Sequence, residues 1–143
     1  MQLLTELALG LLTGLAYGLL GIVLLALGYV ALDLVTPGRL GELVYTQRNT
    51  NAALVVASGL AAIGIIVTTA IVTSEDAFAR GVTSTLGYGL LGVVLLAVSF
   101  VVVDRLTPGN LGAMVADRER HPAVYITMAA HLAVGAIVAA AIS

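Results

Sequence analysis

The stretch YGLLGIVLLALGYVALDLVTPGRLG, residues 17–41, is a long apolar run that ends in a polar turn. It recurs as YGLLGVVLLAVSFVVVDRLTPGNLG at residues 88–112. Extended in both directions, residues 10–72 align with residues 81–143 without a gap, and 26 of the 63 aligned residues are identical. Apolar bias alone does not match Asp, Thr, Pro and Gly in register. We therefore predict a single domain, residues 1–143, made of two repeats (residues 10–72 and 81–143).

The composition is that of a membrane protein. Of the 143 residues, 60% are hydrophobic and 10% are charged, whereas soluble domains average about 25% charged residues. This balance excludes an ordinary soluble enzyme, a disordered chain and a nucleic-acid-binding protein. Four runs of 23 to 26 residues contain no Asp, Glu or Arg, and about 20 helical residues cross a hydrocarbon core. We predict an all-α integral membrane protein with four transmembrane helices at residues 7–35, 51–73, 82–106 and 123–142.

The arginines predict the orientation, because cytoplasmic loops carry an excess of positive charge. The second connection holds only Arg80, beside Glu75 and Asp76. The first and third connections hold the other five arginines: Arg39, Arg48, Arg105, Arg118 and Arg120. Those connections are therefore predicted to be cytoplasmic, with both termini on the opposite side of the membrane. Since each repeat has two spans, the two repeats would insert in parallel.

Glycines form a stripe along the first span, at Gly14, Gly18 and Gly21, and along the third, at Gly89 and Gly92. Small residues allow helices to approach closely in lipid. The stripes therefore indicate packing faces, although they could also line a narrow pore. A small-residue face left over after folding would favour a homo-oligomer, with a dimer expected first.

Each first helix of a repeat ends in the motif D-x-x-T-P-G. We expect Thr36 and Thr107 to be N-caps and Pro37 and Pro108 to open short helices. Apolar spacing after each turn indicates an amphipathic segment lying on the cytoplasmic leaflet. We call these segments elbows. The candidate functional residues of the two turns are Asp33, Thr36, Pro37, Gly38, Asp104, Thr107, Pro108 and Gly109.

Asp33 and Asp104 stand near helix C-termini, where a carboxylate opposes the helix dipole. A nearby arginine, a cap on the following elbow or water could offset this. Both residues are therefore either capping or ion-pairing groups or a proton- or cation-binding site.

His131 is predicted to lie near the midplane, about 15 Å along its helix from His121. An ionisable group inside the membrane is a functional candidate, but we favour a neutral His that is hydrogen-bonded to a neighbouring carbonyl or hydroxyl. Its counterpart in the first repeat is Leu60. The sequence lacks phosphate-binding loops, nucleophile motifs and metal-ligand spacings. We predict no catalytic residue, cofactor or metal.

The D-x-x-T-P-G elbow, followed in the first repeat by Asn51-Ala52-Ala53 opening a helix of small residues, resembles the domain-of-unknown-function 350 proteins, the YjfL-like bacterial inner-membrane proteins. The second copy has His121-Pro122 where the first has Thr50-Asn51, so any role of Asn51 is asymmetric. The resemblance implies association with membrane-stress proteins and with peptide-ligase-like enzymes; the family's own activity is not established.

Together these features predict a non-enzymatic membrane module that recruits cytoplasmic partners, such as membrane-stress proteins, in envelope homeostasis. Its other neighbours would be the lipid bilayer and a second copy. The alternative is a homo-oligomeric channel or transporter for an ion or small solute, based on the glycine stripes and His131. An enzyme acting on a lipid is a third class.

Overall fold

The computed structural model describes residues 1–74 and 78–143; Glu75 and Asp76, used above to orient the chain, lie outside the described residues. The described chain is helical, with no strand. Four of its helices are long and apolar enough to cross a membrane: α1 (Gln2–Val35), α2 (Thr50–Val72), α3 (Phe78–Leu106) and α5 (Pro122–Ile142). The predicted all-α class and its four spans are confirmed. α1 begins five residues earlier than predicted, and α3 begins four residues earlier. The apolar run does not set the start of a helix, because a helix can extend beyond this run into water.

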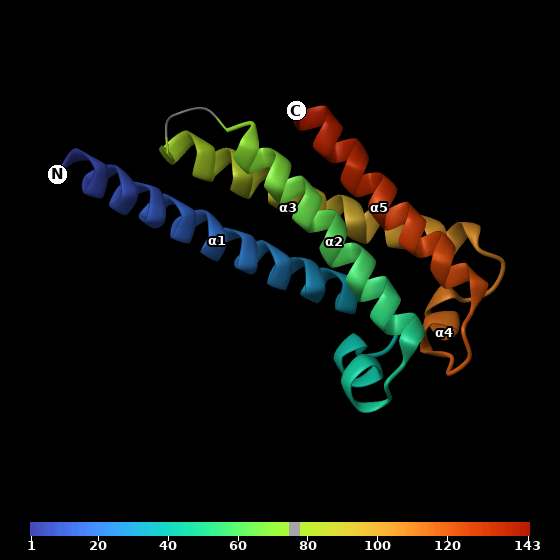
Figure 1. Cartoon of the computed structure of the whole chain (residues 1–143). Coiled ribbons are helices and arrows are strands. Elements are labelled where there is room, and N and C mark those ends of the chain that lie inside the picture. Colours follow the sequence, from blue (N-terminus) through green and yellow to red (C-terminus); the bar gives the residue numbers. More distant parts are fainter. Residues whose placement is uncertain (75–77) are drawn as a thin grey trace.

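The four long helices form one bundle (Figure 1). α2 packs most extensively against α5 and also contacts α3 and α1, while α1 rests on α3 and α2. The two short helical segments of the elbows lie together at one end of the bundle, and both chain termini lie at the other (Figure 1). This arrangement agrees with an even number of crossings between the termini.

Two buried clusters form the core. The middle cluster joins α1, α2 and α3 through Leu24, Ala62, Ile63, Val67, Val93 and Leu96. The second cluster fills the elbow end with Leu32, Leu40, Leu43, Ala52, Val55, Phe100, Leu111, Val115, Ala123 and Val124. Side chains from all four long helices and both elbows thus close this end of the bundle.

The elbows pack inward, which corrects one expectation. The first contains a short π-helix, η1 (Glu42–Thr46), and the second a short helix, α4 (Leu111–Ala116). Leu40 and Leu111 are fully buried in the elbow-end cluster. Their apolar faces are therefore not available to the leaflet. The spacing of the apolar residues in each elbow correctly indicated one apolar face. The spacing could not show whether this face contacts lipid or the protein core.

The turns also differ from expectation. Thr36 ends α1 instead of capping an elbow: its N–H donates to the Leu32 carbonyl at 3.0 Å, and it is extended, with φ −91° and ψ 122°. A proline disfavours helical geometry in the residue before it, so Pro37 accounts for this end. Thr107 bonds the Val103 carbonyl in the same way, at 2.9 Å.

After each proline the chain reverses through a glycine. Gly38 and Gly109 have φ of +99° and +110°, a backbone conformation that glycine adopts without the steric cost other residues meet. Asn110, not Thr107, caps α4, because its Oδ1 accepts from the Ala113 N–H at 3.0 Å.

The two glycine stripes have different surroundings. A methyl group at Gly14 or Gly18 would meet no atom within 4 Å, and one at Gly21 would lie 3.8 Å from Val67. At Gly89 it would collide with Leu24, and at Gly92 it would lie 2.6 Å from Ile66. The stripe of α3 is thus packed inside the bundle, whereas Gly14 and Gly18 face outward.

Candidate functional site

The two aspartates of the turns make the same contact in each hairpin. Asp33 Oδ1 accepts a hydrogen bond from the Leu40 N–H at 2.6 Å, and Asp104 Oδ1 accepts one from the Leu111 N–H at 2.9 Å. Each carboxylate therefore lies in the last turn of one helix and caps the segment that follows. Of the three ways considered for offsetting the helix dipole, the structure uses the cap on the elbow. This contact fixes the elbow relative to its transmembrane helix.

Asn51 joins α2 to the second elbow. Its side chain is 2% exposed. Its Nδ2 lies 2.7 Å from the Glu119 carbonyl and 3.2 Å from those of Met114 and Asp117, and its Oδ1 accepts from the His121 N–H at 3.3 Å. One amide thus holds the backbone of residues 114–121. Proline occupies the equivalent position in the second hairpin and has no side-chain amide, so only the first hairpin supplies this contact.

Asn49 is a second amide in this site, and the sequence analysis missed it. Its Oδ1 caps α2 by accepting from the Ala52 N–H at 3.0 Å, while its Nδ2 donates to the Asp117 carbonyl at 2.8 Å. An Asn just before a helix is a common N-cap signal, so the cap could have been found. The bond to Asp117 could not, because 68 residues separate the two.

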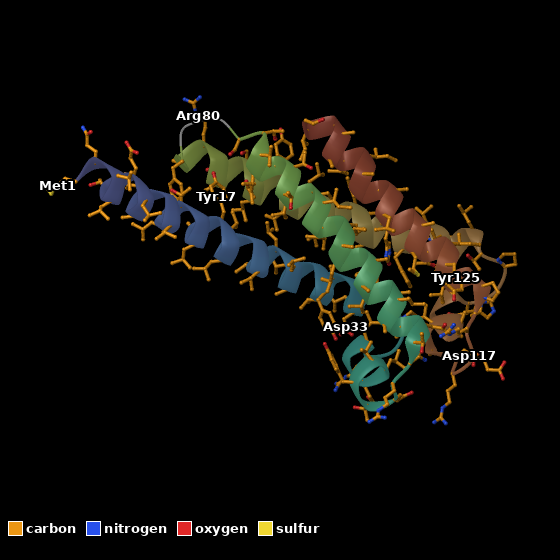
Figure 2. All side chains as sticks on the ribbon, viewed as in Figure 1. Met1, Tyr17, Asp33, Arg80, Asp117 and Tyr125 are labelled. Carbon is orange, nitrogen blue, oxygen red and sulfur yellow. The ribbon has the colours of Figure 1, made fainter. Side chains whose placement is uncertain are left out.

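Charged side chains cover the outside of the elbow end. Figure 2 shows Asp33 and Asp117 at this end, and Met1 and Arg80 at the other. The run Asp117-Arg118-Glu119-Arg120 is exposed at all four residues. Exposed residues of the first elbow are Arg39, Glu42, Tyr45, Thr46, Gln47 and Arg48. In the part of the chain that the structure describes, no three His, Asp or Glu residues come close enough to hold a metal.

His131 lies away from the elbows, inside the bundle. Its side chain has no accessible surface, so no water-sized space adjoins it. Its Nδ1 lies 3.1 Å from Ser58 Oγ, and the Phe100 ring packs 6.4 Å away. Ser58 Oγ also lies 3.0 Å from the Val55 carbonyl, so its single proton goes either to that carbonyl or to His131 Nδ1. The Nε2 of His131 is buried without a partner.

The structure therefore separates the predicted residues into three groups. Asp33, Asp104 and Asn51 lie at the elbow end, where each holds a different backbone segment. The turns at this end contain Thr36, Pro37, Gly38, Thr107, Pro108 and Gly109. His131 stands apart in the core, and the glycine stripes lie along α1 and α3.

Comparison with known proteins places these features in a family. Residues 6–142 match the model of the family described as Domain of Unknown Function (DUF350). A UPF0719 transmembrane protein of Mycolicibacterium paratuberculosis is 35% identical over 127 residues, 89% of this chain and 84% of the relative. A UPF0719 transmembrane protein of Mycobacterium bovis is 34% identical over 140 residues, 98% of this chain and 92% of the relative. No solved structure matches the chain.

Proposed function

The chain belongs to the DUF350 family, and from that premise we propose that it is a non-enzymatic membrane module whose elbow end recruits a soluble partner in envelope or membrane-stress homeostasis. The protein is a membrane protein with four spanning helices. Our proposal adds an orientation, with the elbow end cytoplasmic and both termini outside a bacterial inner membrane. The distribution of arginines supports this orientation.

The observation that carries the proposal is the way the second elbow displays charge. Asp117, Arg118, Glu119 and Arg120 all expose their side chains. The Asp117 and Glu119 carbonyls of the same run are held by buried Asn51. Charged side chains on a fixed backbone lose less entropy when a partner binds, so the surface is prepared for recognition.

The inner side of the elbows supports the same function. Leu40, Leu43, Leu111 and Val115 fill the elbow end of the core, and the aspartates cap the segments from within the protein. The aspartates of the D-x-x-T-P-G motifs thus hold the elbows, and with them the exposed surface of the elbow end, in place. A pore through the bundle of one protomer would instead need this end to be open.

Transport has weaker support. Among the Asp, Glu, Arg and His residues that the structure describes, only His131 lies near the middle of a spanning helix, and no water-sized space adjoins it. A transport site needs a path through which an ion or solute can exchange with water. The single conformation offers none at His131.

The outer face of α1 supports a dimer as the form of this module. Gly14, Gly18 and Gly21 line a groove of about 410 Å³ between α1 and α2, with Gly64 on its other wall. Small residues spaced four apart in an apolar helix are typical of helix–helix contacts between membrane proteins. A second copy of the chain is the proposed neighbour, and the mass of the complex in nanodiscs tests it.

The recruitment proposal is tested by capture from native membranes into nanodiscs, with bound proteins counted by mass spectrometry. Wild type is compared with Arg118→Ala/Arg120→Ala, which removes two exposed charges. The matched control, Gln2→Glu/Thr5→Glu, changes the net charge equally at exposed positions of the opposite end. We expect one soluble protein in stoichiometric amount with wild type and control, and its loss from the double Arg variant.

Asn51→Ala gives a second test, because it keeps the charged side chains and releases their backbone. We expect weaker capture of the same partner. A partner retained equally by all variants would contradict the proposal. A bare homo-oligomer would favour transport, and flux in proteoliposomes with His131→Ala as control would then decide.

A further inference from the structure

A shallow apolar groove lies between the elbow-side ends of α1 and α3. It has a volume of about 360 Å³ and is lined by Val35 of α1 and by Ala97, Val98, Val101, Val102 and Arg105 of α3. The α3 residues recur every three to four positions, so they share one face of that helix. Val98 and Val102 remain about half exposed. This face of the bundle therefore turns toward the bilayer.

Arg105 stands at the elbow-side end of this groove. It lies in the last turn of α3 and is exposed. Its neighbour Asp104 is engaged by the Leu111 N–H of the elbow. Among residues 1–74 and 78–143, no hydrogen-bond or ion-pair partner of Arg105 is found. A guanidinium without an anion thus borders an apolar groove near the end of a membrane-spanning helix.

We propose that this groove and Arg105 form a binding site for one phospholipid with a net negative headgroup. An acyl chain lies along the α3 valines, and the phosphate is bound by the guanidinium. Arg presents a planar fork of donors that matches a phosphate group in a bidentate contact. The distance from Ala97 to Arg105 is about 12 Å along the helix, so the groove lies in the hydrocarbon region and Arg105 lies near the headgroups.

The net charge of the headgroup distinguishes this lipid from others. A zwitterionic headgroup partly neutralises its own phosphate with a cation, whereas a phosphatidylglycerol headgroup does not. Basic residues next to a membrane span attract anionic lipids by about 1 kcal/mol each, or about fivefold in affinity. The site therefore selects an anionic headgroup through the charge of Arg105 and holds the acyl chain by apolar contact.

The first hairpin provides the matched comparison. Its residue equivalent to Arg105 is Leu34, which is 79% exposed at the end of α1. The variant Arg105→Leu thus installs the residue that the other hairpin already carries at an exposed position. Arg39 is another exposed arginine of the elbow end, and it does not line this groove.

The experiment titrates the purified full chain in detergent with phosphatidylglycerol or phosphatidylcholine and counts the lipid retained by native mass spectrometry. We expect wild type to bind one phosphatidylglycerol about fivefold more tightly than phosphatidylcholine. Arg105→Leu should lose this preference, and Arg39→Leu should keep it. Val98→Phe, which fills the groove and leaves Arg105 in place, should weaken both lipids.

Three outcomes would overturn the proposal: an unchanged preference in Arg105→Leu, an equal loss in Arg39→Leu, or full competition by inorganic phosphate alone. The last would mean that the groove has no part in binding. The thermal unfolding midpoint of each variant is measured in parallel. If Val98→Phe does not fold, the comparison of the two arginine variants still decides.

Discussion

The two copies of Tyr-Gly-Leu-Leu-Gly, at residues 17–21 and 88–92, have the same sequence and different surroundings. In α1, Gly18 faces open space. In α3, Gly89 accommodates the side chain of Leu24, and Gly92 that of Ile66. α3 is contacted by α1, α2 and α5, whereas α1 rests on α2 and α3 and leaves one side free. A stripe of small residues therefore permits a close approach, and the position of its helix in the bundle decides whether a neighbour uses it.

The elbow end shows a second difference between the hairpins. Asp33 and Asp104 make matching caps. Asn51, however, forms hydrogen bonds to the second elbow. Its counterpart Pro122 has no side-chain amide, so it cannot form equivalent bonds to the first elbow. The two hairpins thus share how each elbow is capped and differ in how the elbow is attached to the bundle. Four groups of substitutions test this comparison.

The largest effect is expected from the glycine pair. Gly89→Leu should lower the free energy of unfolding by about 3 kcal/mol, because the added side chain overpacks a filled site. Gly18→Leu at the equivalent position of α1 should change the free energy of unfolding by less than about 0.5 kcal/mol. No atom lies within 4 Å of a methyl group placed at Gly18. Unfolding in mixed micelles measures both.

Equal losses in the two variants would show that α1 is as enclosed as α3 and would contradict the comparison. The mass of the Gly18→Leu complex adds a separate readout. A shift from dimer to monomer without a change in stability of the monomer would assign the open stripe to a second copy.

Asn51→Ala is expected to come next, with a loss of about 2 kcal/mol, because the part-buried hydrogen bonds that hold the backbone of the second elbow would be lost together. Thr50→Ala, at an exposed neighbouring position, is the control. Amide hydrogen exchange should become faster at the His121 N–H, which donates a hydrogen bond to Asn51 Oδ1. Unchanged exchange there would rule out the attachment.

Asp33→Ala and Asp104→Ala should each cost about 1 kcal/mol, the usual loss when a helix cap is removed. Asp33→Asn and Asp104→Asn keep an acceptor oxygen and should recover most of the stability. Thermal unfolding of the four variants tests this. A loss at one hairpin only would break the equivalence of the two caps.

Among the substitutions inside the bundle, the smallest effect is expected at His131→Leu, which places in the second hairpin the residue that the first has at Leu60. The change in unfolding free energy should stay below about 1 kcal/mol, because the ring's Nε2 is buried without a partner and Ser58 keeps its bond to the Val55 carbonyl. A loss above about 2 kcal/mol would indicate that the core depends on the imidazole.

Much of the fold was predictable because the bilayer sets a simple length requirement. The charge-free runs identified the four spans, and D-x-x-T-P-G identified both turns. The caps were assigned to the wrong residues. Thr36 and Thr107 precede prolines and end their helices. The capping oxygens come from Asp33 and Asp104 in the preceding helical turns and, for α4, also from Asn110. Local sequence preference favours Thr as an N-cap. It does not predict a hydrogen bond between an Asp side chain and the backbone N–H seven residues later.

The sequence by itself determined the membrane class, the spans, the turns that require Gly38 and Gly109, and the family. These follow from composition and from backbone sterics, which act locally. Only the tertiary structure decided that the elbows close the core, that Asn51 holds the second elbow, and that one glycine stripe is packed while the other is open. These contacts join residues far apart in the chain, and identical motifs differ in them because the bundle gives each helix different neighbours.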